Sequence, residues 1–565
     1  MKLWELKSPS PEIAKKLVDE LRISSLLARL LINRELLDPD QAGRFLFHTL
    51  KDLPNPFLLK DMDRAVERIL RAMKAKEKIV VYGDYDVDGT TGTSLLLLFF
   101  REIGYPVHFY IPNRMSEGYS LNLQAVHKLR EQGFAVMITV DNGIAAVKEV
   151  EAAQKIGLDV IVTDHHVVPD PLPPGYAVIN PLRADSEYPA REICGTGVAF
   201  NLVMALRNRL RETGWFSNRP EPNLKKYLDL VALATVADVV PLKGVNRILV
   251  RHGLEQITDT AWPGLKALIQ VAGIKNEVTA MHLGFYLGPR VNACGRLYDA
   301  STGVKLLTSE SSSEAASLAS ELNSANEERK KVEKDILAEA LAMLKTDTGS
   351  RMSHVFFREN WHPGVIGIVA SRIADKAARP VFLLGTDGEN LKGSGRSYGG
   401  LHLVDALKEC APFLVKFGGH KAAAGVTLKK EMLGLFQDAF EAAVARKLLP
   451  EACVRRMKID AEIGLDEITE AFYQELKLLE PFGEGNPEPL FCLKNIEGRG
   501  ARIVGEKHLK FTACDNGTRV GAIAFGLSER LAQISKPVDL ACSLQKDSFQ
   551  GVQNLVLHIR DIRPA

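Results

Sequence analysis

The sequence contains few cysteines, and none stands in a pattern typical of a disulfide framework or a structural zinc site. Seven cysteines lie singly at positions 194, 294, 410, 453, 492, 514 and 542. No two have C-x-x-C spacing and their number is odd, which disfavours both classes of site. We therefore expect a protein of the reducing cytoplasm.

Long apolar runs and an excess of one charge are also missing. The N-terminal residues Met-Lys-Leu-Trp-Glu-Leu-Lys lack the apolar stretch of a signal peptide. The apolar run 95–100 is far too short to span a bilayer, so we expect no contact with a membrane. The net charge of +2 decides nothing about nucleic acid, because acidic surface elsewhere can offset a basic groove.

Glycine and proline are absent between Gly303 and Gly349. Apolar residues from Leu318 to Leu344 recur at spacings of three, four, seven or eight, as on one helix face. A helix of roughly 35 residues would be about 50 Å long and could connect two domains. We expect this connecting helix within 301–350, with a bent helical hairpin as the alternative.

The 565 residues exceed what one hydrophobic core usually holds, so three or four domains are expected. Residues 1–60 read as short helices, an extension that we expect to pack on the first domain. From 61 to 300, helix-like and strand-like runs alternate, which predicts a parallel α/β sheet. The expected helices span 65–73, 91–103, 121–132, 145–156 and 224–237, and the expected strands 79–82, 107–111, 136–140 and 160–163.

The C-terminal half divides into two further regions. A second, smaller α/β unit is expected over 351–450, and a small β-barrel of the OB type over 455–565. In the smaller unit we expect strands at 353–357, 380–384 and 391–395 and helices at 364–377 and 402–410. In the barrel we expect strands near 457–463, 490–494, 501–504, 509–514, 519–525, 538–544 and 554–562.

Acidic and imidazole side chains follow three of the predicted strands. The motifs are Asp84-Tyr85-Asp86-Val87-Asp88, Asp141-Asn142-Gly143 and Asp164-His165-His166. Because the carboxyl ends of parallel strands meet at one edge of a sheet, these side chains should lie together. Up to five carboxylates and two imidazoles would repel one another unless multivalent cations neutralise them. The sequence therefore predicts a site for two metal ions.

The donor types indicate which metal and which chemistry. In extended backbone, Asp86 and Asp88 would point to the same side. Carboxylates and imidazoles without cysteine suit Mg²⁺ or Mn²⁺, and imidazole favours Mn²⁺. Two such ions would activate a water and stabilise the leaving oxygen of a phosphate ester. Each motif alone is more often a solvated turn, but coincidence at three strand ends is a poor explanation.

These motifs resemble the signature of the DHH superfamily of phosphoesterases, and 236–242 resembles its last metal-ligand motif. Four further segments resemble the RecJ family within it, exonucleases that degrade single-stranded DNA from 5′ to 3′. They are Gly288–Arg296, Trp361–Gly367, Gly395–Ser397 and Gly418–His420. The likeness runs from about residue 60 to the C-terminus. Cys294 stands where the family pattern has alanine, and the polarity comes from the resemblance alone.

The resemblance implies a role for each residue of the cluster. Asp141 would bridge the two ions, Asp86 would hold one, and Asp88, His165 and Asp238 would hold the other. His166 would contact the scissile phosphate or assist the leaving group. Asp84 would either contact a metal or orient its neighbours through hydrogen bonds. The plain alternative for Asp238 is the last residue of a helix that Pro241 ends.

The smaller unit resembles the DHH-associated domain, which binds substrate across a cleft from the metals. Gly393–Ser397 would offer backbone N–H groups and a guanidinium to a terminal phosphate, with Gly418–His420 as the matching wall. Any single arginine can equally be a surface ion-pair partner. The expected substrate-binding residues are Arg114, Arg290, Asn292, Arg296, His362, Arg372, Arg396, Ser397, Gly419 and His420. The barrel would add a groove for unpaired DNA, with Lys507, His508 and Lys510 as candidate contacts.

The resemblance implies metal-dependent hydrolysis of single-stranded DNA to mononucleotides, in DNA repair and recombination. The first alternative is a phosphodiesterase for short oligonucleotides or cyclic dinucleotides; a manganese pyrophosphatase is a weaker one, and both types lack the C-terminal tail. A non-catalytic DHH scaffold of replication is a third alternative, and it should have gaps in its ligand set. Implied partners besides single-stranded DNA are single-stranded-DNA-binding protein and a RecQ-type helicase, although no motif establishes either.

Overall fold

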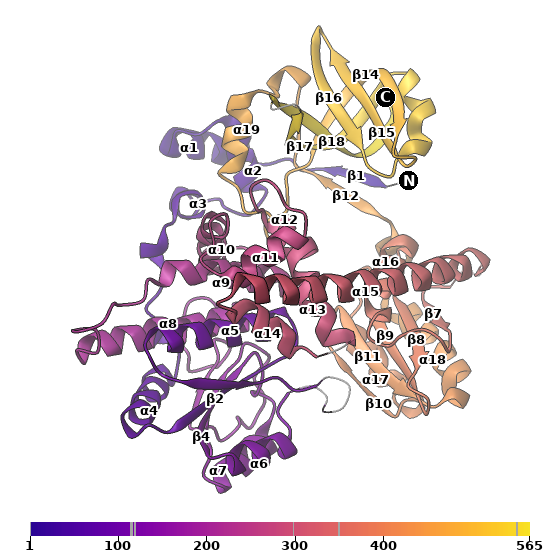
Figure 1. The fold of residues 1–565 in the computed structure, drawn as a ribbon. Helices are drawn as coiled ribbons and strands as arrows, with labels where there is room; N and C mark the ends of the chain where they lie inside the picture. The colour runs from indigo at the N-terminus through magenta and orange to yellow at the C-terminus, as the bar shows by residue number, and fades with distance from the viewer. Residues whose placement is uncertain (1, 114–116, 118–119, 298, 348–350, 550–551) are drawn as a thin grey trace. The chain divides into compact units, whose positions relative to one another are not determined.

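The computed structural model of the chain describes residues 2–113, 117, 120–297, 299–347, 351–549 and 552–565 (Figure 1). It confirms the expected class: a parallel α/β sheet, a long helix, a smaller α/β region and a C-terminal barrel. The chain forms two units. The larger comprises residues 4–289, 300–318 and 458–565, and the smaller comprises 290–299 and 319–457 with the first few residues.

A five-stranded parallel sheet in the order β3-β2-β4-β5-β6 supports the first α/β region. Its strands are β2 (Lys78–Gly83), β3 (Val107–Tyr110), β4 (Phe134–Val140), β5 (Asp159–Thr163) and β6 (Ala177–Ile179). The chain passes from β2 to β3 on one side and then to β4 on the other, so the strand order reverses beside β2. Ligands of open parallel sheets bind at such a reversal, outside the carboxyl ends of the strands.

Four helices accompany this sheet: α4 (Met62–Ala75), α5 (Val87–Glu102), α6 (Leu123–Glu131) and α7 (Val147–Lys155). Helix α5 begins four residues earlier than expected. The reason is that the carboxylate of Asp86 accepts the backbone N–H of Gly89 and caps the helix. The prediction that Asp86 and Asp88 share an extended segment is therefore wrong, because Asp88 lies in the first helical turn.

A group of helices between residues 195 and 308 was largely missed by the periodicity analysis. It comprises α8 (Gly195–Glu212), α9 (Leu228–Ala237), α10 (Gly244–Ile257), α11 (Pro263–Val271), α12 (Ala280–His282), α13 (Gly288–Leu297) and α14 (Ser301–Thr308). Helices α8 and α9 pack against α5. Of the helices in this group, α9 was predicted, as part of the helix expected over 224–237. The expected helix 224–237 starts with a 3-10 turn at Leu224–Tyr227.

Helix α15 (Ser312–Thr346) is one continuous element of 35 residues. This confirms the long helix and excludes the bent hairpin. Its first seven residues belong to the larger unit and the remainder to the smaller. In the smaller unit, Ile336 and Ala340 of this helix share an apolar core with Trp361 and Val369.

The smaller unit contains a five-stranded sheet in the order β10-β11-β9-β8-β7. Only β7 and β8 run parallel. Its strands are β7 (His354–Phe357), β8 (Val381–Thr386), β9 (Leu391–Arg396), β10 (Lys416–Gly419) and β11 (Ala423–Leu428). Its helices are α16 (Ile366–Ala377), α17 (Leu403–Glu409) and α18 (Leu433–Lys447). Strands β10 and β11 and helix α18 were not predicted.

The C-terminal barrel is closed by pairing of β14 with β17, as expected for an OB-type fold. Its strands are β13 (Ala461–Glu462), β14 (Phe491–Val504), β15 (His508–Asp515), β16 (Thr518–Ala524), β17 (Val538–Phe549) and β18 (Val552–Pro564), with helix α19 (Glu470–Lys477) between β13 and β14. The runs at 490–494 and 501–504 were predicted as two strands. They form one strand that carries a bulge between Arg499 and Arg502.

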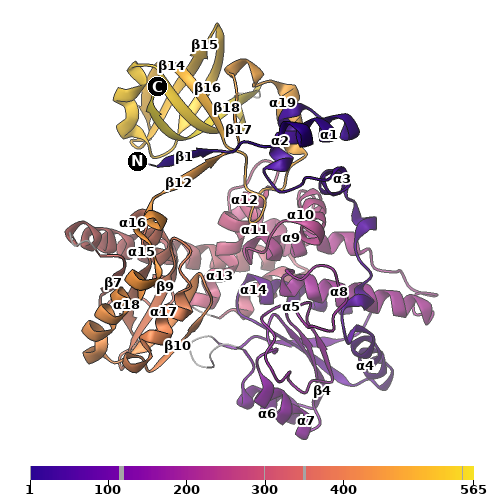
Figure 2. The ribbon, with the colours of Figure 1, turned by 180° about the vertical axis from the view of Figure 1, so that it is seen from behind.

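The N-terminal extension contains β1 (Leu3–Leu6), which pairs with β12 (Arg456–Ile459), and helices α1 (Pro11–Leu21), α2 (Ser25–Ile32) and α3 (Pro39–Phe47). Apolar residues of these helices share one core with the barrel (Figures 1 and 2). The expectation that they pack on the first domain therefore holds only in part. Periodicity reveals the apolar face of a helix but not which core that face joins. Within the described residues, none of the helices has the length and apolar character that a membrane crossing requires.

Candidate metal centre

Four loops of the larger unit bring seven side chains together. The segment from the end of β2 to the first turn of α5 carries three of them, the loops after β4 and β5 carry three more, and the last follows α9. Their ligand atoms lie within 4.8 Å of one another in three groups: Asp84, Asp86 and Asp141; Asp88, His165 and Asp238; and Asp141, His165 and His166. Asp141 and His165 each belong to two groups, and only Asp141 joins the group of Asp84 and Asp86 to a group that contains histidine. The sequence prediction of which residues gather matches this geometry, whereas their roles as ligands stay predictions.

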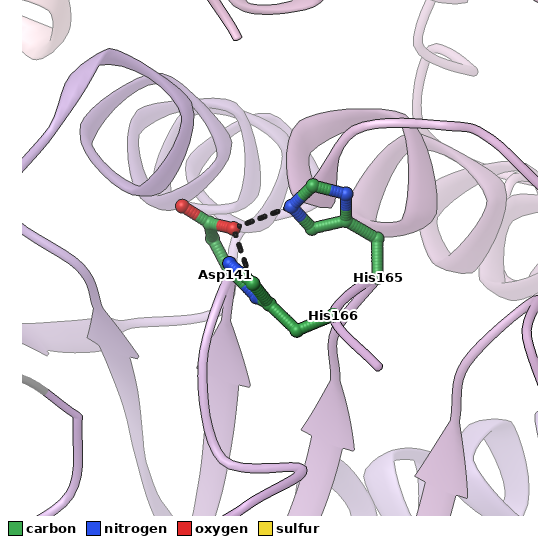
Figure 3. Close-up of side chains that lie close together, drawn as sticks. All are labelled: Asp141, His165 and His166. Atoms are coloured by element: carbon green, nitrogen blue, oxygen red, sulfur yellow. Dashed lines mark ion pairs between the residues drawn. The ribbon is translucent and has the colours of Figure 1, made fainter. Parts of the chain in front are cut away.

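Asp141 and His165 face one another within the cluster, and Asp141 also faces His166 (Figure 3). The Nε2 of His165 is 3.0 Å from Asp141 Oδ1, 3.8 Å from Asp88 Oδ2 and 3.8 Å from Asp238 Oδ2. Among the described residues, neither His165 Nε2 nor Asp141 Oδ1 has a hydrogen-bond partner, although both atoms are buried. A buried polar atom without a hydrogen-bond partner destabilises the folded protein. Two such atoms that face each other at this distance are arranged as two ligands of one cation would be. The donor set therefore fits a bound divalent ion.

The cluster carries more negative charge than it can hold ionised by itself. Burial, reinforced by Asp88 and Asp86, raises the pKa of Asp141 well above its usual range. Burial, followed by the same two neighbours, raises the pKa of Asp238 to about 9. Burial lowers the pKa of His165. Divalent cations would lower the pKa values of the two carboxyl groups, because they stabilise the ionised carboxylates. They would also stabilise the neutral imidazole that burial of His165 already favours.

The N-terminus of α8 positions Asp88. The backbone N–H of Gly195 donates to Asp88 Oδ2 at 2.5 Å and that of Thr196 donates to Oδ1 at 2.7 Å. A Cβ on Gly195 would lie 2.7 Å from the Cβ of Asp141, so only glycine allows this approach. Sequence reasoning missed Cys194–Gly197. The available signal was a pair of glycines around a threonine at a helix start, where N–H groups are exposed.

Asp164 positions His166 and is not itself in the ligand groups. Its Oδ1 accepts from the backbone N–H groups of His165 (2.7 Å) and His166 (3.1 Å) and from His166 Nδ1 (2.7 Å), and its Oδ2 accepts from the N–H of Ile144 (2.9 Å). Burial alone would raise the pKa of Asp164, but the hydrogen bonds from His166 outweigh it and the pKa is lowered. The same contact raises the pKa of His166 against the effect of burial. The Nδ1 of His166 also lies 3.8 Å from Asp141 Oδ1, so Asp164 holds the His166 ring against the cluster.

Two backbone positions beside the cluster are strained. Asp141 has φ 63° and Val239 has φ 60°. Positive φ is rare for residues other than glycine, above all for a β-branched one. Asp238 is the C-cap of α9, as its position before Pro241 predicted, and Val239 turns the chain directly after it. Strain of this kind persists where the surroundings enforce it, typically at functional sites.

Arg396 is the strongest anion-binding candidate of the smaller unit. Its Nε donates to Ser371 Oγ at 3.0 Å, and its Nη1 donates to Ser394 Oγ at 3.1 Å and to the carbonyl of Gly395 at 2.8 Å. These partners are uncharged, and burial lowers the pKa of the guanidinium. A half-buried cation held by neutral oxygens keeps its charge available for an anionic ligand.

The backbone part of the predicted phosphate cradle is wrong. Residues 391–396 form β9, which pairs with β8 on one side and β11 on the other, so the ladders use its N–H groups. Gly419 of β10 likewise pairs with Ala424 of β11. A Cβ on Gly419 would lie 2.4 Å from the carbonyl oxygen of Ala423. The amide of His420 donates to that carbonyl, and Ser397 Oγ donates to Leu401.

Several other predicted substrate residues already have protein partners. Arg372 forms an ion pair with Glu333 at 2.7 Å, and the Nε of buried Arg290 donates to Asn323. His362 accepts the backbone N–H of Gly364 at its Nδ1. Asn292 lies half-buried in α13. Outside the described part of the chain are Arg114 and the side chain of Arg296.

The barrel presents an aromatic residue that sequence reasoning missed. Phe525, directly after β16, is 52% exposed. Its ring lies 5.0 Å from that of His508 and 5.4 Å from that of His558, centre to centre. An exposed ring beside Lys507 and Lys510 can stack on an unpaired base. A single phenylalanine at a strand end gave no periodic signal.

Family models match three regions of the chain. The DHH family N-terminal domain matches residues 78–235, the DHHA1 domain matches 349–446, and the RecJ OB domain matches 459–561. The order and bounds of these matches agree with the sheet carrying the cluster, the smaller mixed sheet and the closed barrel.

Curated relatives are similar over nearly the whole chain. The single-stranded-DNA-specific exonuclease RecJ of Salmonella typhimurium is 39% identical, with 95% of this chain and 96% of that protein covered. The RecJ of Bacillus subtilis is 38% identical over 93% of this chain, and the chain spans 66% of its length. The crystal structure of RecJ from Thermus thermophilus in complex with Mn²⁺ has a TM-score of 0.84 at 32% identity, covering 100% of this chain and 80% of that one. The corresponding Mg²⁺ complex has a TM-score of 0.79 at 30% identity, covering 100% and 78%.

Proposed function

The chain belongs to the RecJ family, and we propose that it is a metal-dependent exonuclease that hydrolyses single-stranded DNA from 5′ to 3′ into mononucleotides, in DNA repair and recombination. The observation that supports this most is the position of Asp141 in two ligand groups at the reversal of the sheet order. Two ions sharing one carboxylate suit an in-line displacement at a phosphodiester.

The proposed cofactors are two Mn²⁺ or Mg²⁺ ions. One would be held by Asp86 with Asp141, and the other by Asp88, His165 and Asp238. The imidazole favours Mn²⁺ over Mg²⁺. When bound, the ions supply an activated water and neutralise charge on the phosphate. Asp84 accompanies the first group, where it either contacts an ion or orients its neighbours.

His166 would act on the scissile phosphate. Its Nδ1 lies 2.7 Å from Asp164 Oδ1, which holds the ring in place beside the cluster. Its raised pKa keeps the ring protonated over a wider pH range, so it can donate a proton to the leaving oxygen. Asp164 supports this role by fixing the ring and stabilising its charge.

The remaining contacts would bind the strand. Arg396 would hold the terminal 5′-phosphate, while Phe525 and the basic residues near it would stack and steer unpaired bases. The family resemblance adds single-stranded-DNA-binding protein and a RecQ-type helicase as partners and the cytoplasm as location. Co-purification of the chain with either protein from a cell extract tests the proposed partners.

Two alternatives from other classes receive less support. A phosphodiesterase for short oligonucleotides or cyclic dinucleotides, like a manganese pyrophosphatase, would not need the closed barrel that matches the RecJ OB domain. A scaffold that had lost catalysis should lack ligands, whereas all the predicted ligands of the described chain come together.

The test is release of nucleotides from single strands labelled at the 5′ or the 3′ end, with a duplex as control substrate and Mn²⁺ or Mg²⁺ as cofactor. Asp141→Ala and His165→Ala should each abolish release and leave the unfolding temperature of the metal-free protein nearly unchanged. The matched control is His127→Ala, an exposed histidine of α6. Turnover at the control level in either cluster variant would refute the assignment.

Arg396→Ala tests the phosphate contact separately. Loss of one charge-assisted hydrogen bond should weaken binding of a 5′-phosphorylated strand by about 1.5–3 kcal/mol. A strand with a 5′-hydroxyl should bind the variant and the wild type alike. Lys392→Ala on the same strand is the control, because that lysine pairs with Asp387. An affinity equal to wild type across salt concentrations would show that the contact is misplaced.

A further inference from the structure

Away from the metal centre, the larger unit has a cavity between α3 and the first half of α10. These two helices are neighbours in Figures 1 and 2. The cavity volume of about 330 Å³ is at the lower end of the range for small-molecule sites. The cavity, here called the α3–α10 pocket, shares no residue with the candidate metal centre. Five cationic side chains line it, against one carboxylate, Glu35. They are Arg34, Arg44, Lys243, Arg247 and Arg251.

Carboxylates outside the pocket offset these positive charges only in part: burial lowers the pKa values of Arg34 and Arg247, and Asp460 and Glu480 counteract this without cancelling it. Within the described part of the chain, no carboxylate lies within ion-pair distance of any of the five. Buried Arg247 donates instead to the carbonyls of Phe45, Leu478 and Leu479, and Arg251 donates to the carbonyl of Leu46. Burial, followed by repulsion from Arg251 and Arg34, lowers the pKa of Arg247 to about 9, and Glu480 offsets this only in part. An anion in the pocket would relieve this repulsion.

The backbone of α10 adds donors to the same wall. Lys243 is the N-cap residue, and its side chain makes no capping hydrogen bond. Gly244 faces open space, with nothing within 4 Å of where its Cβ would stand. The first-turn N–H groups of a 14-residue helix favour an anion there. Lys243, Arg247 and Arg251 recur every four residues, so all three lie on the face that lines the pocket.

We propose that the α3–α10 pocket binds a small phosphate monoester of the size of a nucleoside 5′-monophosphate. The phosphate would lie at the start of α10 between Lys243 and Arg44. The rest of the ligand would rest on the apolar part of the wall, formed by Leu36, Phe45 and Ile248. A bare phosphate would leave this apolar part and most of the volume unused. The inference does not depend on the proposed nuclease activity, but with it the pocket would sense the released product.

The test is binding of thymidine 5′-monophosphate to the full chain in excess EDTA, in an Asp141→Ala background that disables the metal centre. Isothermal titration measures affinity, and hydrogen exchange of residues 241–251 reports the location. Inorganic phosphate and thymidine are the comparison ligands. The pocket variant is Arg44→Glu with Lys243→Glu, two exposed residues. The control, Lys266→Glu with Lys305→Glu, makes the same charge change at two exposed lysines outside the pocket.

We expect the monophosphate to bind and to slow exchange at the start of α10, while thymidine does not. The pocket variant should bind at least about tenfold more weakly, because two cationic contacts are reversed, and the control should bind like the wild type. Arg44→Gln with Lys243→Gln removes the charges without reversing them and should give a smaller loss in the same direction.

Three results would overturn the inference. The first is no binding of the monophosphate at roughly millimolar concentration, and the second is equal affinity in the pocket variant and the control. The third is inorganic phosphate binding as tightly as the monophosphate, because the apolar wall would then contribute nothing. Nuclease activity enters none of these measurements, so failure here and failure of the proposed function are distinguishable.

Discussion

Gly195→Ala places one methyl group where the N-terminus of α8 approaches the tip of β4. The new Cβ would stand 2.7 Å from the Cβ of Asp141, 2.9 Å from its Cα and 3.1 Å from its Oδ1. Carbon atoms in ordinary contact are about 3.5–4.0 Å apart, so Asp141 or α8 must shift by about 0.8 Å. Metal–ligand distances tolerate deviations of only about 0.2 Å. A residue outside the ligand set should therefore control metal binding.

The expected loss in Mn²⁺ affinity is at least about 10–100-fold, the range found when groups supporting ligands are altered. Nucleotide release should fall at least as far, since Gly195 also donates its N–H to Asp88. The cost to stability should be smaller, about 1–3 kcal/mol, as for other overpacked sites. Titration with Mn²⁺, a nuclease assay and the unfolding temperature of the metal-free protein separate the three effects.

The matched control is Gly434→Ala in α18, where nothing lies within 4 Å of the added Cβ. It should bind Mn²⁺ like the wild type, and its helix should gain up to about 1 kcal/mol of stability. Wild-type Mn²⁺ affinity in Gly195→Ala would refute the reasoning. It would mean either that α8 moves freely or that Asp141 is not a ligand.

Three further outcomes are expected. Asp164→Asn should leave the N–H of Ile144 facing the NH₂ group of the new amide, at a cost of about 1–3 kcal/mol in stability. It should also lower the pKa of His166, so that the alkaline fall of kcat occurs at lower pH. An unshifted pH profile would contradict the role of the Asp164–His166 pair. Burial raises the pKa of Asp229 to about 7, so the folded chain keeps a proton that the unfolded chain loses near pH 4. Stability should fall by up to roughly 4 kcal/mol as pH rises through this window, and Asp229→Asn should flatten that part of the unfolding-temperature profile. Mn²⁺ at 100 times its Kd should add about 2.7 kcal/mol to stability and release protons on binding, seen as buffer-dependent titration heats, and both effects should vanish in Asp141→Ala.

Much of the architecture was accessible from the sequence because its signals are local. The β-branched runs ending in Asp84, Asp141 and Asp164 identify buried parallel strands and the edge where they end. The absence of glycine and proline between 303 and 349, together with one apolar face, predicts α15. The misses follow from the same rule. Strand β6 is too short to show a pattern, and the early start of α5 depends on one capping hydrogen bond.

The sequence by itself determined which chemical groups are present and that three strand ends would bring them to one edge. Only the tertiary structure decided how they meet. The N-terminus of α8 orients Asp88, the N–H of Ile144 helps to hold Asp164, and the β9 ladders occupy the N–H groups that were predicted to bind phosphate. The physical reason is range: helix and strand patterns arise between residues a few positions apart. The position of the Asp88 carboxylate, by contrast, depends on N–H donors of Gly195 and Thr196, about a hundred residues away.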